Sequence, residues 1–357
     1  MTAKVYFSGL RDECLPEEQA EKTAVIFDAA GAGKCIAPED FVAVKIHVGE
    51  KNNRTHVHPS VATAVVGKVK QYQGQPFLTE TATLYKGERE NAIKHLVHAY
   101  RHGFGFEQVG APFIMADGLA GSTEVEVEIN GELNRSVRIA REIRVADAIM
   151  VISHPTGHMI TALGACIKNL GMGLASRMGK MRQHSSMKPK VKSAACRLCR
   201  KCLDWCPEGV ISANADAVCI DAERCSGCGE CLAVCRFGAM EFNWGQDPAR
   251  VQKEMAEYAY GAIKGKEEKC FYINVLVNMT KDCDCLAEDQ SKIMPDMGIL
   301  GSFDPVAVDK ATLDLTEAPA GRNLAETSYC ELNAMEQLNH AVKLGMGTLD
   351  YEIVKVK

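Results

Sequence analysis

Apolar and β-branched runs alternate with segments of helical periodicity over most of the chain. Short apolar runs predict buried strands at 41–48, 76–80, 146–153 and 271–277. Apolar residues spaced three and four apart predict helices at 59–70, 88–101, 160–169, 248–263, 307–316 and 331–344. Strands that alternate with helices are typical of an α/β fold, so we expect an α/β domain with a mostly parallel sheet.

The alternation stops between residues 190 and 245, where cysteines dominate the pattern. Two runs of the form C-x2-C-x2-C-x3-C occupy 196–206 and 225–235. Each has the spacing of bacterial ferredoxins that hold two [4Fe–4S] clusters. We therefore expect an inserted 2[4Fe–4S] ferredoxin-like domain of the α+β type at 190–245. It would interrupt the α/β domain, whose first part is 1–189 and whose second part is 246–357.

The spacing also predicts how the cysteines divide between the two clusters. Three thiolates two residues apart reach three corners of one cube, whereas the fourth points toward the other cube. The predicted ligands are Cys196, Cys199, Cys202 and Cys235 for one cluster, and Cys225, Cys228, Cys231 and Cys206 for the other. Zinc sites usually separate two cysteine pairs by a longer loop, and disulfide frameworks are typical of small secreted chains. The spacing therefore favours two iron–sulfur clusters over zinc sites or disulfides. Because such clusters transfer single electrons, we expect the protein to take part in electron transfer.

Composition limits location and partners. A chain of 357 residues with 16 cysteines does not need disulfides to fold, and free thiols beside clusters favour the reducing cytoplasm of an anaerobe. We recognise no signal peptide and no apolar run of membrane-spanning length. The formal net charge of −5 argues against nucleic acid as the main partner. A cytoplasmic protein with no membrane or nucleic-acid partner is expected.

Polar side chains stand where the predicted strands end. Because ligands bind beyond the carboxyl ends of parallel strands, these side chains indicate a cleft for a small-molecule substrate or a cofactor. The candidate catalytic residues are His154, His158, Lys168, Cys283 and Cys285. The candidate cofactor-binding residues are His47, Glu80 and Asn169. The sequence does not identify the substrate.

In four stretches the chain resembles DUF362, a family of uncharacterised iron–sulfur proteins. The stretches are 44–59, 153–171, 282–285 and 298–309. Lys-Asn-Leu-Gly at 168–171 and Ser-Phe-Asp-Pro-Val-Ala-Val-Asp at 302–309 are the most specific parts. The resemblance covers nearly the whole chain. It implies this architecture, with a ferredoxin unit where members often carry one, and a candidate cleft, but no substrate.

The candidate histidines also have structural explanations. His47 lies in an apolar run and would equally suit a hydrogen-bonded histidine in a strand. His56 and His58 lie in a polar loop, where simple solvent exposure is the favoured expectation. Proline and glycine between His154 and His158 indicate a loop, from which the imidazoles would ligate a metal or bind an anionic substrate.

The remaining candidates divide between structure and chemistry. Lys168 would hold a carboxylate or phosphate, or would be an ordinary surface lysine. Asp304, which precedes a proline, is interpreted as a helix N-cap. Cys283 and Cys285 are too close in sequence to form a mutual disulfide easily. They would ligate a further metal together with His154 or His158, take part in redox chemistry, or pack as free thiols.

Three classes of function fit these features. We favour an oxidoreductase in which two clusters pass electrons between a soluble donor and the cleft. A flavin there is compatible with the sequence, although no dinucleotide-binding motif is present. The alternatives are a non-enzymatic electron carrier or redox sensor, and a protein that handles a metal or cofactor through Cys283, Cys285 and the histidines. Nine basic and no acidic residues between Gly171 and Leu203 indicate either a solvated linker or a docking surface for an acidic ferredoxin or flavodoxin.

Overall fold

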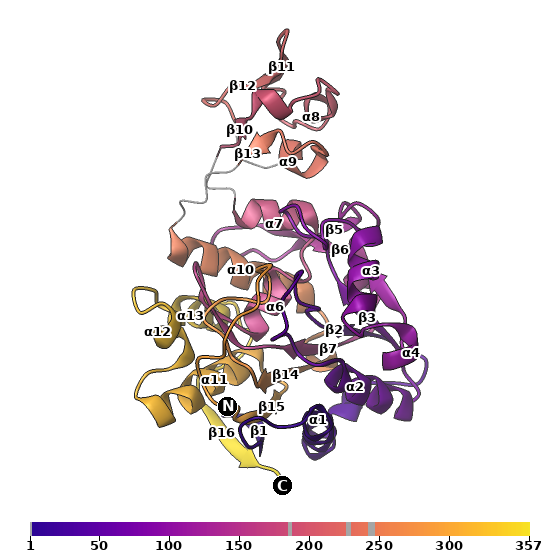
Figure 1. The fold of residues 1–357 in the computed structure, drawn as a ribbon, viewed down its shortest axis with the longest axis vertical. Coiled ribbons are helices and arrows are strands. Elements are labelled where there is room, and N and C mark those ends of the chain that lie inside the picture. The colour runs from indigo at the N-terminus through magenta and orange to yellow at the C-terminus, as the bar shows by residue number, and fades with distance from the viewer. Residues whose placement is uncertain (1, 185–187, 226–229, 242–246) are drawn as a thin grey trace.

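The computed structural model describes residues 2–184, 188–225, 230–241 and 247–357. An eight-stranded sheet forms its centre (Figure 1). In spatial order the strands are β16 (Tyr351–Lys355), β1 (Ala3–Gly9), β15 (Gly298–Ser302), β14 (Cys270–Leu276), β7 (Ala148–Ser153), β2 (Phe41–Lys45), β3 (Gln75–Glu80) and β4 (Phe113–Met115). Only β15 runs antiparallel to its neighbours. The prediction of an α/β fold with a mostly parallel sheet is therefore confirmed.

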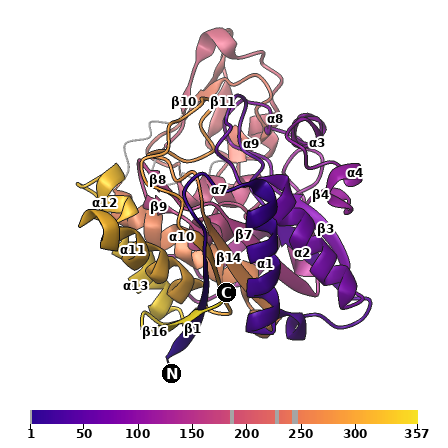
Figure 2. The same cartoon turned by 60° about the horizontal axis from the view of Figure 1, so that its bottom comes forward.

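Helices cover both faces of this sheet (Figures 1 and 2). On one face lie α1 (Pro16–Ala30) and α2 (Pro59–Gln71), and on the other α6 (Cys166–Gly171), α10 (Pro248–Ile263), α11 (Pro305–Ala320) and α13 (Met335–Lys343). Side chains of β7 alternate between these two cores: Ile149 and Val151 pack on one side, Met150 and Ile152 on the other. Burial on both faces explains why the central strands are continuous apolar runs. Among the described residues, no helix combines the length and apolar character needed to cross a bilayer.

Shorter elements complete this part of the chain. They are α3 (Ala92–Arg101), α4 (Phe106–Val109), α5 (Arg141–Val145), α7 (Arg177–Gln183), α12 (Leu324–Ser328), the paired strands β5 (Glu124–Glu128) and β6 (Ser136–Ala140), and 3₁₀ turns at Ala32–Cys35, Ser193–Ala195 and Glu267–Lys269. Helix α3 begins four residues later than predicted, because the Asn91 side chain accepts a hydrogen bond from the Lys94 amide and caps it.

The predicted helix at 160–169 is wrong in its first half. Residues Thr156–His158 (β8) and Ala162–Gly164 (β9) form a β-hairpin instead, and Ala162 has a φ of 58° in the turn. Helix α6 starts only at Cys166, because the carboxylate of Asp309 accepts hydrogen bonds from the Cys166 and Ile167 amides. A buried apolar run has the same composition in a hairpin and in a helix, so periodicity could not separate them.

The cysteine-rich segment stands apart from the sheet, at the upper end of Figure 1. Its described elements are β10 (Lys190–Val191), α8 (Lys201–Asp204), β11 (Ile211–Ala213), β12 (Val218–Ile220), α9 (Glu230–Val234) and β13 (Met240–Glu241). Strand β10 pairs with β13, and β11 pairs with β12. The first and last strands of the segment, β10 and β13, therefore lie side by side. Helix α9 packs against α7, which connects the segment to the α/β part.

Candidate functional site

The loops that follow the carboxyl ends of the central strands enclose a cavity of about 810 Å³. All eight residues proposed for the cleft line it: His47, Glu80, His154, His158, Lys168, Asn169, Cys283 and Cys285. The hairpin β8–β9 contacts the loop after β14 that carries Cys283 and Cys285, called the cysteine loop below. The Gly157 amide donates to the Thr280 carbonyl at 2.9 Å. A Cβ atom at Gly157 would lie 2.2 Å from the Lys281 carbonyl oxygen, so only glycine permits this approach.

A thiol and an ammonium group meet in this cavity. Lys168 Nζ lies 3.1 Å from Cys283 Sγ, and the Cys285 amide donates to the same sulfur at 3.3 Å. Hydrogen bonding from Cys285 lowers the pKa of Cys283, and the Lys168 charge lowers it further against the effect of burial. The pKa of Cys285 is raised. The pair therefore shares one proton, with the negative charge on Cys283.

A buried ion pair lies beside this thiolate. Asp284 Oδ2 is 2.7 Å from His154 Nδ1, and the Val277 carbonyl is 2.8 Å from Nε2 of the same ring. Burial alone would lower the pKa of His154, but Asp284 and the carbonyl raise it. Because both ring nitrogens face acceptors, His154 is an imidazolium that is held in place on both sides.

His158 has the opposite character. Its Nδ1 accepts hydrogen bonds from the Ile160 and Thr161 amides at 3.2 and 3.1 Å. Burial and the neighbouring charge of Lys168 lower its pKa well below the usual value. The ring is therefore neutral, with its proton on Nε2. One neutral and one charged imidazole thus line the same cavity.

A buried charge network forms the far wall of the cavity. Lys45 Nζ lies 3.3 Å from Glu80 Oε1 and donates to Asn169 Oδ1 at 2.7 Å. Burial would raise the pKa of Glu80, but the charges of Lys45 and Arg89 hold it well below its usual range. The buried charges of Lys45 and Glu80 therefore compensate each other, as burial requires.

Arg89, in the loop after β3, connects that loop to the loop after β2 in the same wall. Its guanidinium reaches Glu50 at 3.2 Å, Glu80 at 3.4 Å, His47 Nε2 at 3.0 Å and the Tyr85 hydroxyl at 2.6 Å. Burial and Arg89 lower the pKa of His47 well below normal, so this ring is neutral. Sequence analysis missed Arg89 and the role of Lys45. Glu50 lies 39 residues from Arg89, and Glu80 lies 35 residues from Lys45. Neither Arg89 nor Lys45 belongs to a recognisable motif.

Part of the predicted basic segment also belongs to this wall. Lys180 is buried, lines the cavity and donates to the Ala82 carbonyl at 2.6 Å. Burial lowers its pKa to about 8. The Arg177 guanidinium reaches the Leu84 carbonyl at 3.5 Å. These two residues are structural parts of the α/β domain, so the predicted docking surface does not include them.

The hypothesis of a further metal at Cys283 and Cys285 gains no support. In the ranges that the structure describes, no three His, Cys, Asp or Glu side chains are arranged to hold a metal ion. Cys283 Sγ already has an ionic partner, since the ammonium of Lys168 lies 3.1 Å from it. His154 is already bonded on both nitrogens.

The cysteines of the two repeated runs occupy the separate segment. Burial raises the pKa of Cys202, and so does the proximity of Cys199, Cys235 and Cys196. These are the four thiols that the spacing of the two runs assigns to one cluster. A four-iron cube is wider than a single ion, so its thiolates need not approach each other as ligands of one ion do. Cys206, Cys225 and Cys231 are three of the four cysteines predicted for the other cluster. The fourth, Cys228, falls outside the described residues.

Comparison with known proteins gives one family and several partial relatives. The sequence profile of the family described as "Domain of unknown function (DUF362)" matches residues 42–314. Hydrogenase-4 component A of Escherichia coli (strain K12) is 31% identical over 113 residues, 30% of this chain and 53% of that protein. Electron transport protein HydN of the same strain is 41% identical over 51 residues, 14% of this chain and 29% of that protein.

The name of a third relative refers to iron–sulfur chemistry. The iron–sulfur subunit of a putative dimethyl sulfoxide reductase from Halobacterium salinarum is 30% identical over 98 residues, 26% of this chain and 36% of that protein. The chain therefore spans about half the length of the first relative and about a third of the other two. Its similarity to iron–sulfur and electron-transport proteins is limited to segments.

Proposed function

Because the chain belongs to the DUF362 family, we propose that it is an iron–sulfur oxidoreductase whose cysteine-rich segment serves the cavity of the α/β part. Two [4Fe–4S] clusters, held by the eight cysteines of the repeated runs, would supply single electrons. The substrate would be a small anionic molecule in the cavity. The similarity to iron–sulfur and electron-transport proteins supports the redox part of this proposal.

The position of the cysteine-rich segment carries the proposal. Helix α9 packs on α7, and α7 contributes Lys180 to the cavity. Gly238, three residues after Cys235, lies against the ammonium of Lys86, which also lines the cavity. Cys235 lies close enough to Arg177 on α7 for a thiolate at Cys235 to raise the pKa of that arginine. The cluster that includes Cys235 would therefore lie closer to the cavity than the β11–β12 hairpin at the far end (Figure 1).

The cavity residues have properties suited to reduction of an anion. Lys168 would bind a carboxylate or phosphate as a point charge, in competition with the Cys283 thiolate. His158, neutral with a proton on Nε2, would supply that proton to the substrate. The His154–Asp284 pair would keep the cysteine loop in position. The Cys283–Cys285 pair, with one shared proton, would accept or release a proton as charge develops.

A cluster reoxidation experiment tests this function. Anaerobic protein would be reduced with dithionite and mixed with a panel of small carboxylates that contain a reducible carbonyl or double bond. We expect at least one to reoxidise the clusters. Lys168→Met should slow reoxidation about tenfold or more and leave iron, sulfide and the paramagnetic signals unchanged. The matched control Lys192→Met changes an exposed lysine of the cysteine-rich segment and should have no effect.

The outcome also decides between classes of function. Reoxidation at the wild-type rate in Lys168→Met would show that the cavity is not the site of reduction. Protein whose clusters exchange electrons only with protein partners, with no response to any small molecule, would favour the electron carrier.

A further inference from the structure

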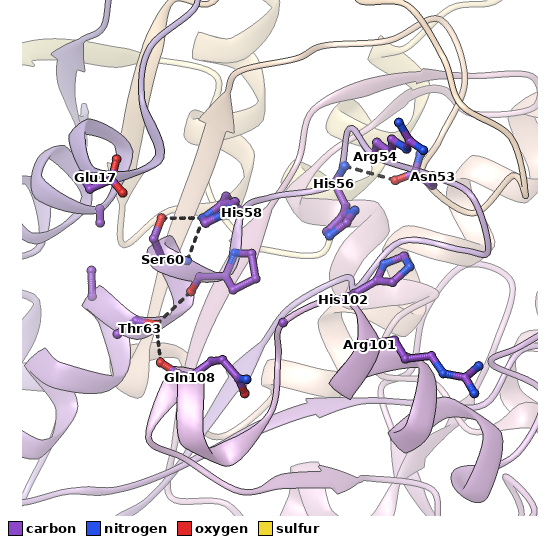
Figure 3. Close-up of a pocket in the computed structure, with 14 residues that line it drawn as sticks. Glu17, Asn53, Arg54, His56, His58, Ser60, Thr63, Arg101, His102 and Gln108 are labelled. Atoms are coloured by element: carbon purple, nitrogen blue, oxygen red, sulfur yellow. Dashed lines mark hydrogen bonds between the residues drawn. The ribbon is translucent and has the colours of Figure 1, made fainter.

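A second cavity, of about 930 Å³, opens on the other side of the loop that follows β2 (Figure 3). It lies between the start of α2, the end of α3 and the turn that follows α3. None of its lining residues lines the first cavity. The residues that give it its character are Arg54, His56, His58, Arg101 and His102.

Two arginines supply uncompensated positive charge. Arg54 and Arg101 are exposed and lie along one side of the cavity, with His102 between them (Figure 3). Within the part of the chain that the structure describes, neither guanidinium forms a hydrogen bond or an ion pair with a carboxylate. Glu17 is the single acidic residue among the lining residues. Guanidinium groups bind phosphate and carboxylate oxygens in pairs of parallel hydrogen bonds.

The histidines supply donors and flat surfaces. His58 Nδ1 accepts from the Ser60 amide at 3.2 Å, which leaves the proton on Nε2 as a donor. The rings of His56 and His102 stack with their centroids 4.8 Å apart. Burial lowers the pKa of His56 to about 4, so this ring is neutral at physiological pH. The sequence-based expectation that His56 and His58 are merely solvated is therefore incomplete.

The start of α2 adds a favourable dipole. This helix of 13 residues begins with Pro59 directly after His58, at the edge of the cavity. The first amides of α2 are already bonded, Ser60 to the His58 ring and Val61 to the His58 carbonyl, so this helix contributes its dipole, which attracts anions. The rest of the lining combines the apolar side chains of Ala20, Pro59 and Ala64 with the polar ones of Glu17, Ser60, Thr63 and Gln108. One side of the cavity thus suits an anionic group, and another suits an uncharged body.

We propose that this second cavity binds a small phosphate ester. Arg54 and Arg101 bind the phosphate oxygens, the Nε2 proton of His58 adds a donor, and the uncharged part of the ligand packs on Ala20, Pro59 and Ala64. This site is separate from the proposed redox cavity and does not depend on it. Asn53 lines the new site and donates to Asp284 at 3.3 Å, so the two cavities share a wall.

Calorimetric titration of the intact, cluster-containing protein tests the proposal, with adenosine diphosphate and inorganic pyrophosphate as probes at about 0.15 M salt, where the screening length is about 8 Å. We expect saturable binding of at least one probe. Arg54→Ala and Arg101→Ala should each weaken it about tenfold or more, and Arg54→Glu should weaken it further. The control Arg135→Ala changes an exposed arginine away from the cavity and should leave binding unchanged.

Three results would overturn the site. They are no binding of either probe at millimolar concentration, equal binding by wild type and both alanine variants, and binding that appears only at low salt. Thermal unfolding of each variant, monitored by circular dichroism, checks that the exposed substitutions leave the fold intact.

Discussion

Three consecutive residues of the cysteine loop contact three different parts of the protein. Cys283 faces Lys168 on α6, Asp284 pairs with His154, and the Cys285 carbonyl accepts from the Tyr85 hydroxyl at 3.0 Å. The loop is therefore fixed by its own side chains. This arrangement explains why two thiols separated by one residue have different chemistry, since only one of them faces an ammonium group.

The ionisation of Cys283 can be measured through its reactivity. The thiolate is the reacting form, so the alkylation rate rises as pH passes through the pKa of the folded protein. Because Cys285 and Lys168 lower that pKa, wild-type Cys283 should react with iodoacetamide at lower pH than an ordinary thiol. Lys168→Met should move the midpoint upward by about one unit or more. Site-resolved mass spectrometry gives the rate, with exposed Cys330 as the internal control.

Identical pH profiles for Cys283 in wild type and Lys168→Met would contradict the proposed thiolate–ammonium contact. The sequence located the thiols, because two cysteines after a predicted strand are an unusual pattern. It could not give their different ionisation, which depends on Lys168, 115 residues away in sequence. Arg89 was missed for a similar reason: its partner Glu50 lies in the loop after another strand, β2.

At the scale of elements, Asp309 connects the parts that position Lys168. Its carboxylate accepts from the first two amides of α6 and from the Asn274 side chain on β14, at 2.8 to 2.9 Å. Asp304, at the start of the same helix α11, accepts from the Val306 and Ala307 amides, which confirms its interpretation as an N-cap. Both aspartates of the family motif therefore have structural roles. Asp309 also determines where α6 begins.

Removal of Asp309 should destabilise the fold and disturb the cavity together. Asp309→Ala leaves two amides of α6 and the Asn274 amide without this acceptor, and a loss of about 2–4 kcal/mol is expected. The measurement is denaturant unfolding of the anaerobic protein. Asp304→Ala, a matched change on the same helix, should cost about 1–2 kcal/mol as a lost cap. It should leave the alkylation profile of Cys283 unchanged, whereas Asp309→Ala should shift it.

The elements differ in how well sequence predicts them. β2, β3, β7 and β14 were predicted because burial on both faces makes them apolar. α10 was predicted with its observed bounds, since Asp247 and Pro248 mark its start. β15 was not predicted, because its sequence GILGS contains two glycines, which are rare in strands. It forms its hydrogen bonds with both neighbouring strands, β1 and β14. β1 and β16 were not predicted, because their pairing partners are remote in sequence.

At the scale of the whole molecule, the exposed charge of the cysteine-rich segment has a direct consequence. Of the nine basic residues in the predicted docking surface, Arg197, Arg200 and Lys201 are exposed beside Cys196, Cys199 and Cys202. Lys192 instead pairs with Glu241 at 3.1 Å. Arg197, Arg200 and Lys201 form no ion pair within the described residues, and they would lie next to one cluster. They are better placed than Lys192 to attract an acidic electron donor.

Charge reversal at these three positions should slow electron delivery. Arg197→Glu with Arg200→Glu and Lys201→Glu should reduce the second-order rate of cluster reduction by an acidic ferredoxin about tenfold or more, because steering depends on complementary charge. Stopped-flow absorbance gives the rate, which should also fall with salt in the wild type. Reduction by dithionite should not change. Arg135→Glu with Lys355→Glu is the control, and a rate indifferent to both salt and charge reversal would leave the segment as a linker.

The pairing of β1 determines the order in which the protein can be completed during synthesis. β1 lies between β15 and β16, so its first partner is made roughly 300 residues after it. At about 5–20 residues per second, β1 waits on the order of 15–60 s on the ribosome. The cysteine-rich segment closes locally, from β10 to β13, and can be finished long before then. This segment can thus close while both edges of β1 are still unpaired, and unpaired strand edges of this kind are prone to aggregation.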